Sequence, residues 1–492
     1  MTYAELLDRA RATAAFLMDM VEPGDRVAVW GPNSTQWAVA SFAALFAGGA
    51  VVPLNSRYTS PEAADIVGRA GCRLIFAEHE FLGRRLAAEA RAMAPAAVVI
   101  GTGPGAEEGV VGMQYALDQS SASQSDLDAR LGGMAPDALS HVQFTSGTTG
   151  RPKGAMLRHE AMVRTTADWV RTVGLHAGDR YPVIAPFSHI GGHKTGLLAS
   201  VTAGCAALPF AIFDLEQLMV AIDDDGVTVL QGPPTMFQGL VARARTEGRH
   251  LSTLRVAVTG AATVAPSLVR EMLEVLGVEQ VFTAYGLTET TGICTITRAG
   301  DPVETIAATS GRPVPHVEVD IVDQNDRSVP VGTRGEIVVR GFNVMAGYLD
   351  DPAATDEAIR AGWLHTGDIG WMSDDGCLSI VDRLKDMIIV GGFNVYPAEI
   401  EHTLLEHRDV AQAAVVGIPD ERLGEVPVAF VVPHPGVALD VGVLEAFSRA
   451  RLANFKRPRT VFPVEALPVN AAGKVVKAEL RSRVAAQPSG AP

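Results

Sequence analysis

From Val27 to Ser56 the chain carries no charged side chain. Glycine and proline at positions 31–34 and a Gly48-Gly49 pair divide this stretch into pieces too short to cross a bilayer. The pieces predict a strand at 27–30, a helix behind a Ser34 cap that ends at Phe46, and a strand at 50–54. Strands that are apolar on both faces are typical of a parallel sheet covered by helices, so we expect a buried βαβ unit and no membrane span.

The same alternation of short apolar runs and helical patterns continues along the chain. A helical pattern at 81–93 lies between two strands, and residues 1–20 have the spacing of an amphipathic surface helix. Alternation of this kind predicts doubly wound α/β packing, here in two related lobes up to about residue 300. The further predicted strands are 73–77, 97–100, 180–184, 206–208, 228–231 and 255–259.

The pattern of predicted elements changes after Gly311. Short strands at 317–322, 335–340 and 378–381 are joined by turns rich in glycine and aspartate, which predicts a small antiparallel barrel. We therefore expect an N-terminal domain at 1–381, with the barrel at about 311–381, and a small α+β domain at 382–492. The charged residues of the linker that begins at Asp382 favour a hinge there.

Charge and cysteine content exclude several classes of function. The 492 residues carry a formal net charge of −15, which argues against nucleic acid or an anionic membrane as the main partner. The four cysteines are far apart in the sequence and form no CxxC pair, so we expect them to be reduced, mostly buried thiols of a cytoplasmic protein that imply no metal site. The oligomeric state is open, a homodimer included.

A loop rich in glycine and hydroxyl groups follows the apolar run that ends at Phe144. It reads Thr145-Ser146-Gly147-Thr148-Thr149-Gly150-Arg151-Pro152-Lys153-Gly154. Glycine lets the backbone N–H groups approach a ligand closely, and the hydroxyls and the lysine supply further donors and a positive charge. A triphosphate is the ligand that this pattern favours over an ordinary flexible turn. Pro152 stands where a P-loop would need its second glycine, and no dinucleotide fingerprint is present.

Four shorter motifs have weaker signals when each is taken alone. Tyr285-Gly286-Leu287-Thr288-Glu289 offers a ring that can stack on a purine and a carboxylate that can hold Mg²⁺. Each of the other three has an ordinary explanation as a turn, a solvated linker or a surface lysine. They are His365-Thr366-Gly367-Asp368, Asp382-Arg383-Leu384-Lys385-Asp386 with the nearby Gly391-Gly392-Phe393, and Pro468 to Lys474 with its single lysine.

Taken together and in this order, the motifs resemble those of the adenylate-forming superfamily, which contains acyl-CoA synthetases, luciferases and adenylation domains of nonribosomal peptide synthesis. The resemblance runs from Tyr3 to about Lys477. Met1–Leu6 matches a point that most relatives reach later in their chains. We therefore expect either a start that is assigned late or a first lobe without an edge strand.

The resemblance implies a role for each matching position. The 145–154 loop holds the β- and γ-phosphates of ATP, and Thr288 and Glu289 serve the α-phosphate and Mg²⁺. Gly260, Ala261 and Ala262 border the adenine, and Tyr285 stacks on it; Asp368 holds the ribose with Arg383 nearby. Asp382 is the hinge, Gly391, Gly392 and Phe393 face the pantetheine arm of CoA, and Lys474 bridges the substrate carboxylate and the α-phosphate.

The same resemblance implies an acyl pocket. His189 matches an aromatic position between the pocket and the thiol tunnel, and the walls are expected at Gln231, Gly232, Thr259, Ala284 and Ile293. Adenylation domains for α-amino acids usually hold an aspartate just after an aromatic residue here. In this chain Ser188 and His189 follow Phe187, so an amino-acid substrate is disfavoured. Small residues at 191, 192 and 232 are expected to leave room for a bulky acyl group.

Several passages are most similar to those of actinobacterial ligases that activate ring-bearing propanoates in steroid breakdown. They are 259–264, 283–289 and 452–456. The favoured reaction is therefore ATP-dependent formation of a steroid-ring propanoyl-CoA through acyl-AMP, with Mg²⁺ as the companion ion. The alternatives are a medium- or long-chain fatty acid or an aryl acid, an acyl-AMP ligase that loads a carrier protein, and luciferase-like oxidation. A non-catalytic nucleotide-binding protein is expected to have lost Glu289 or Lys474, and both are present.

Overall fold

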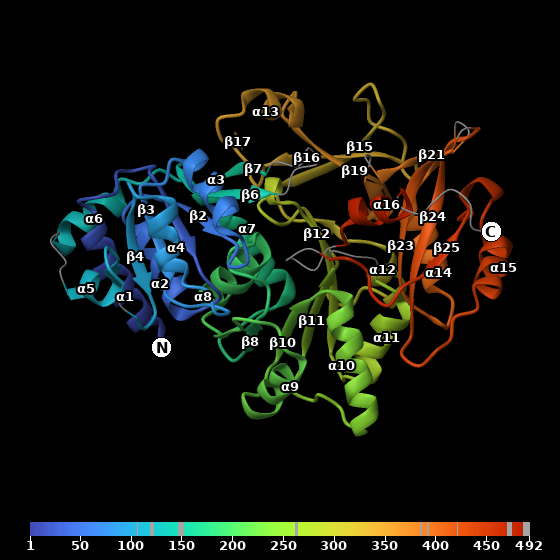
Figure 1. Ribbon diagram of the computed structural model, residues 1–492, viewed down its shortest axis with the longest axis horizontal. Helices are drawn as coiled ribbons and strands as arrows, with labels where there is room; N and C mark the ends of the chain where they lie inside the picture. The colour runs from blue at the N-terminus through green and yellow to red at the C-terminus, as the bar shows by residue number, and fades with distance from the viewer. Residues whose placement is uncertain are drawn as a thin grey trace.

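The computed structural model describes residues 1–105, 107–118, 123–145, 152–260, 264–383, 386–390, 393–420, 422–469 and 475–485, with the backbone alone at 382, 383, 393, 394 and 485. Its architecture is mixed α/β, with a large N-terminal domain of two lobes and a half-barrel sheet, and a separate small α+β domain at the C-terminal end (Figure 1). The fold class expected from the sequence is confirmed. Among the described residues, no helix is both long and apolar enough to cross a membrane.

The first lobe is built on an eight-stranded sheet with the order β17-β7-β6-β2-β1-β3-β4-β5. The expected βαβ unit is present, and the Ser34 side chain caps its helix by accepting from the backbone N–H of Trp37 at 3.0 Å. The strands are β1 (Arg26–Trp30), β2 (Ala50–Leu54), β3 (Leu74–Glu78), β4 (Val98–Thr102), β5 (Val111–Gly112), β6 (Leu139–Thr145), β7 (Lys153–Arg158) and β17 (Gly347–Tyr348). The helices are α1 (Tyr3–Leu17), α2 (Thr35–Phe46), α3 (Ser60–Ala70), α4 (Leu86–Met93), α5 (Met113–Asp118), α6 (Gln124–Gly132) and α7 (His159–Val173).

The helix expected at 81–93 is shorter than predicted. Phe81 and Arg84 exchange backbone hydrogen bonds of 2.9 and 3.0 Å across a tight turn, so that α4 begins only at Leu86. Gly83 in this turn has a φ of 73°, which glycine adopts without strain.

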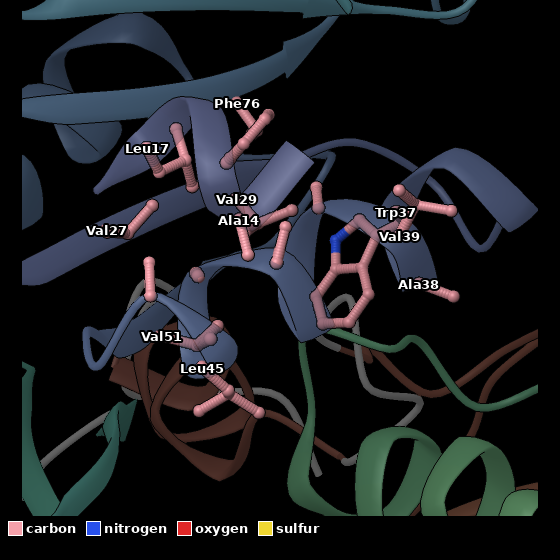
Figure 2. Close-up of a cluster of buried hydrophobic side chains, with 14 of the residues drawn as sticks. Ala14, Leu17, Val27, Val29, Trp37, Ala38, Val39, Leu45, Val51 and Phe76 are labelled. Atoms are coloured by element: carbon pink, nitrogen blue, oxygen red, sulfur yellow. The ribbon is translucent and has the colours of Figure 1, made fainter. Parts of the chain in front are cut away.

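One of the two cores of the first lobe lies between α1, α2 and the sheet. Figure 2 shows Trp37 from α2 among labelled side chains that include Leu17 of α1, Val29 of β1, Val51 of β2 and Phe76 of β3. Each large apolar side chain buried in this way contributes about 1.5–3 kcal/mol to the free energy of unfolding. Alternate residues of the same strands, such as Trp30 and Leu54, are buried in a second cluster against α3 and α4, so burial on both faces explains the uncharged stretch at 27–56.

The second lobe contains a five-stranded sheet, β10-β11-β12-β13-β14, and a separate pair of parallel strands, β8 and β9. Strands β10, β11 and β12 are parallel, so their carboxyl ends meet at one edge. In Figure 1, α10 and α11 lie beside β11. The strands are β8 (Arg180–Val183), β9 (Ala206–Pro209), β10 (Val229–Gly232), β11 (Val256–Gly260), β12 (Gln280–Tyr285), β13 (Thr295–Ile296) and β14 (Arg312–Pro313). The helices are α8 (Ala199–Ala203), α9 (Leu215–Asp224), α10 (Pro234–Glu247), α11 (Pro266–Glu274) and α12 (Val303–Ala308).

A π-helix, η1 (Gly191–Leu198), follows β8 and leads directly into α8. Gly192 approaches the backbone before it so closely that an added Cβ would lie 2.1 Å from the carbonyl oxygen of Pro186. No local pattern predicts this helix type, which is rare and occurs frequently at functional sites.

The half-barrel is an antiparallel sheet of β15 (Val317–Val322), β16 (Gly335–Gly341), β18 (Ile359–Arg360), β19 (Trp363–Met372) and β20 (Leu378–Arg383), accompanied by α13 (Pro352–Ala358). The antiparallel barrel expected at about 311–381 is thus present as an open sheet. The long strand β19 was not predicted, because Gly367 and Gly370 inside it resemble turn residues. The pairing of β19 with β20 shifts register between Ile369 and Gly370, as it does at a β-bulge.

The C-terminal domain is a sheet of order β22-β21-β24-β23, with β25 beside β24. Figure 1 shows this domain next to the half-barrel. Between them, the Arg334 guanidinium lies 3.5 Å from the Glu399 carboxylate and 5.2 Å from the centre of the Tyr396 ring. The elements are β21 (Ile388–Val390), β22 (Phe393–Val395), α14 (Pro397–Leu405), β23 (Val410–Asp420), β24 (Gly424–Pro433), α15 (Val441–Arg451), β25 (Val461–Pro463) and α16 (Lys477–Ala485).

Candidate active site

The glycine- and hydroxyl-rich segment is the connection of an antiparallel hairpin. Strands β6 and β7 pair from Leu139 to Thr145, and Thr145 is opposite Lys153. Residues 146–151, which include Ser146, Gly147, Thr148, Thr149 and Gly150, lie outside the described residues. The hairpin brings the first hydroxyl and the lysine of the loop to the same end of the sheet.

Glu289 lies directly beside this hairpin. It belongs to the short 3₁₀-helix η2 (Thr288–Thr290), which follows the end of β12. The Thr145 hydroxyl donates to its carboxylate at 3.5 Å, and the Tyr348 phenol donates to the same oxygen at 2.9 Å. The Lys153 ammonium lies 5.2 Å from the centre of the Tyr348 ring. Residues distant in sequence thus meet as one cluster of oxygens with a cation beside it.

Tyr348 is a site residue that the sequence did not reveal. Its strand β17 pairs with β7, so the polypeptide of the half-barrel region extends the sheet of the first lobe at this point. Burial and the Glu289 carboxylate both raise the pKa of the Tyr348 phenol above its usual value, which keeps it a hydrogen-bond donor. The only available signal was a tyrosine after Gly347, whose φ of 140° is strained for other residues.

An open cavity of about 450 Å³ lies on the other side of Lys153. Arg69 lines it, donates to the carbonyl of Pro152 at 2.7 Å, and lies 5.2 Å from the centre of the Phe144 ring. Asp350 and Asp351 also line the cavity. Two cations therefore flank the base of the hairpin.

A second cluster joins Tyr285, the last residue of β12, to Asp368 in β19. The phenol donates to the carboxylate at 2.6 Å, and both side chains are buried. Burial, followed by the neighbouring Asp368, raises the pKa of Tyr285 well above its usual value. Arg383 in β20 pairs in register with Asp368, so the expected proximity of these two positions is present in the backbone.

Most residues expected to line the acyl pocket lie at the carboxyl ends of the three parallel strands. Gly232 is opposite Thr259, and Gly260 is opposite Ala284. Gln231 accepts from the Tyr181 phenol at 2.6 Å and from the Thr195 hydroxyl at 2.8 Å. Ligands of open α/β sheets bind at such strand ends, so the structure brings these positions together where a small molecule can bind. Ile293 is buried in the turn that follows η2.

The expectation that glycine leaves room for the acyl group is wrong at position 192. The space beside Gly192 is filled by backbone carbonyls, and an added Cβ at Gly232 would lie 2.4 Å from Cε of Met236. Gly192 therefore permits close packing and does not enlarge a pocket, whereas the end of the flexible Met236 side chain occupies the space beside Gly232. His189 lies just before η1, and its Nδ1 accepts from the backbone N–H of Gly191 at 3.1 Å.

Several expected site residues cannot be placed. Ala261, Ala262, Gly391, Gly392 and Lys474 lie outside the described residues. The side chains of Asp382, Arg383 and Phe393 are not described, although their backbone belongs to β20 and β22. Val469 and Val475 form an isolated bridge that frames the segment containing Lys474.

Two family models together match most of the chain. Residues 1–349 match the AMP-binding enzyme family, and residues 399–474 match the C-terminal domain of AMP-binding enzymes. A 3-[(3aS,4S,7aS)-7a-methyl-1,5-dioxo-octahydro-1H-inden-4-yl]propanoyl:CoA ligase of Mycobacterium tuberculosis is 46% identical over 98% of this chain and 93% of the relative. The ligase of the same name from Rhodococcus jostii is 44% identical over 98% of this chain and 93% of its own. ATP-bound MatB from Rhodopseudomonas palustris superposes with a TM-score of 0.88 at 30% identity, covering 98% of this chain and 93% of that one.

Proposed function

The chain belongs to the AMP-binding enzyme family, and we propose that it activates a dioxo-octahydroindene propanoate, a ring system with two ketones, for transfer to CoA. It is an AMP-forming acyl-CoA synthetase that uses ATP, Mg²⁺ and CoA. The choice of acid depends on one observation, the identity of 46% and 44% over 98% of the chain with two ligases named for that acid.

In the first half-reaction, a carboxylate oxygen of the acid attacks the α-phosphorus of ATP, and pyrophosphate leaves. Two anions must approach each other, so cations are needed to neutralise them. We assign the phosphates to the 145–154 loop and Thr288, and the bridging cation to Lys474. The position of Lys153 beside the Glu289 cluster supports this assignment of the loop.

The Glu289 cluster fits Mg²⁺ because it offers oxygen donors, which that ion prefers, and a single carboxylate. Mg²⁺ bound there supplies positive charge to the phosphates. Glu289 is the proposed ligand, and the Tyr348 and Thr145 hydroxyls fix the orientation of its carboxylate.

Adenosine is assigned to the cluster of Tyr285 and Asp368. The carboxylate accepts hydrogen bonds from the ribose hydroxyls, and the tyrosine ring stacks on the adenine beside Gly260, Ala261 and Ala262. The hydrogen bond of 2.6 Å between the two side chains supports this assignment, because it fixes the ring relative to the carboxylate. Arg383, paired in register with Asp368, is the nearest cation that we assign to this part of the site.

In the second half-reaction, the thiol of CoA loses its proton, its sulfur attacks the acyl carbonyl, and AMP leaves. The thiol needs access to a carbonyl that Lys474 has just covered, so the C-terminal domain must reorient. We assign the hinge to Asp382, where the N-terminal domain of residues 1–381 ends, and the pantetheine passage to Gly391, Gly392, Phe393 and His189. The described ion pair of Arg334 with Glu399 between the domains is partly exposed, so breaking it costs little and is compatible with such a motion.

The cellular setting follows from composition. Four free, buried cysteines suit a reducing compartment, and we propose the cytoplasm. The net charge of −15 favours small-molecule partners over nucleic acid.

A two-stage assay tests the proposed reaction. Enzyme, ATP, Mg²⁺ and the dioxo-octahydroindene propanoate should yield acyl-AMP and pyrophosphate without CoA, and added CoA should convert the adenylate to a thioester. A parallel reaction supplies a phosphopantetheinylated carrier protein in place of CoA. A thioester that forms only on the carrier would contradict the proposed acceptor, and no adenylate from this acid would contradict the proposed substrate.

A further inference from the structure

Lys194 is a fully buried lysine in the π-helix η1. Its relative exposure is 0%, and its Nζ has no hydrogen-bond partner among the residues that the structure describes. A buried amine without a partner destabilises a fold by several kcal/mol when charged and by about 1–3 kcal/mol when neutral. A methionine of similar length would avoid this penalty, so packing alone does not account for the lysine.

The amine lies next to the predicted acyl pocket. Cε of Lys194 is 3.6 Å from the position of a Cβ built on Gly292, and the thiol of Cys294 is near enough to the amine to affect its pKa. Ile293, an expected pocket wall, stands between these two residues. The next residue, Thr195, donates to Gln231, another expected wall. Lys194 is therefore flanked by expected pocket residues on the helix side and on the turn side.

The proposed acid carries hydrogen-bond acceptors, and the amine of Lys194 has no acceptor among the described residues. Apart from its carboxylate, the only polar groups of a dioxo-octahydroindene propanoate are two ketone oxygens, which accept hydrogen bonds and cannot donate them. A ketone that leaves water for an apolar pocket needs a donor. Burial lowers the pKa of Lys194 to about 7, and the amine keeps N–H donors in either protonation state.

We propose that Lys194 is a specificity-determining residue that donates a hydrogen bond to a ring ketone of the acid. This inference rests on the proposed function, which names the acid. An apolar fatty or aryl acid would leave the amine unpaired in the complex and would be disfavoured. The lysine thus selects for an oxygenated ring, and it takes no part in adenylation itself.

The test compares two acids on two enzymes. The acids are the dioxo-octahydroindene propanoate and the matching octahydroindene propanoate without ketones, and the enzymes are wild type and Lys194→Met. We expect Lys194→Met to lower kcat/KM for the dioxo acid by about 10- to 100-fold, mainly through a higher KM. For the ketone-free acid, the variant should have an unchanged or higher kcat/KM. Ser200→Ala is the matched control, because it removes a buried hydroxyl from the same helical segment, where Ser200 donates to Gly196 at 2.8 Å.

The possible outcomes distinguish a failure of the inference about Lys194 from a failure of the proposed function. An equal loss with both acids would show a structural role, and no loss would show that the amine does not contact the ketone; either result overturns the inference while the function stands. A wild-type enzyme that activates neither acid overturns both. A thermal unfolding midpoint for Lys194→Met at or above that of wild type is expected, since the variant removes a buried amine.

Discussion

The phenol of Tyr285 donates a hydrogen bond of 2.6 Å to the carboxylate of Asp368, across the boundary between the second lobe and the half-barrel. The two residues come from β12 and β19, which belong to different sheets. The proposed adenosine site is therefore assembled by the packing of two sheets. This hydrogen bond would link the contacts that we propose with the ribose to those that we propose with the base.

Substitutions at Tyr285 should distinguish the contribution of its ring to ATP binding from that of its hydroxyl. We expect Tyr285→Ala to raise the KM for ATP by about 10- to 100-fold, because stacking of a base on an aromatic ring is worth about 1–3 kcal/mol. Tyr285→Phe should raise it by less than about 10-fold, because the ring remains. Steady-state kinetics with varied ATP measure both effects. Equal effects of the two variants would show that the ring does not contact the base.

Glu289 and Tyr348 should act together in setting the Mg²⁺ concentration that adenylation requires. We expect Glu289→Gln to raise the Mg²⁺ concentration for half-maximal adenylation by at least about 10-fold, and Tyr348→Phe to raise it less, since the phenol only orients the carboxylate. The double variant should resemble Glu289→Gln, because residues that act together are not additive. Pyrophosphate release at varied Mg²⁺ measures this. Additive effects would contradict the positioning role of Tyr348.

Lys474→Ala should affect the two half-reactions unequally. Adenylation should fall by at least about 100-fold, since the variant loses the cation that we propose neutralises the two reacting anions. Conversion of supplied acyl-adenylate to thioester should stay within about threefold of wild type, because the thiol attacks after the lysine has moved away. The two rates are measured separately by single-turnover quench. A matching fall in both would rule out the reorientation of the C-terminal domain.

The buried amine of Lys194 should change how the free energy of unfolding depends on pH. Its pKa falls from 10.5 to about 7 through burial, against the opposing effect of Cys294 and Asp168. The unfolded chain therefore binds more protons than the folded chain between these values, and the contribution of Lys194 to stability rises as the pH increases from 7 towards 10. The thermal midpoint of wild type relative to Lys194→Met should rise over this window. A constant difference would show that the amine is not neutralised by folding.

Local patterns predicted the first lobe well. The βαβ unit at 26–54 combines a capping serine, a helix of apolar residues and two strands without charge, and each of these signals depends on neighbours in the sequence. The strands of the second lobe were found at nearly the same positions for the same reason. The motifs around Thr145, Tyr285 and Asp368 also fell on elements that the structure brings together.

Other parts of the site depend on contacts between distant segments. Strand β7 begins at Lys153 directly after the loop and is recognisable only through its pairing with β6. Asp368 lies inside β19, where glycines suggested a turn, because the pairing with β16 and β20 overrides local preference. Tyr348 and Lys194 could not be singled out, since a tyrosine after glycine and a lysine in a helix are ordinary until their burial and partners are known.

A competition experiment tests the central claim most directly. Equal low concentrations of the dioxo-octahydroindene propanoate, a medium-chain and a long-chain fatty acid, and an aryl acid share one reaction with ATP, Mg²⁺, CoA and wild-type enzyme. The initial ratio of thioesters, measured by mass spectrometry, equals the ratio of kcat/KM values. We predict that the indene propanoyl thioester forms at least about 100-fold faster than any other. A fatty or aryl thioester in the majority would contradict the assignment of the acid.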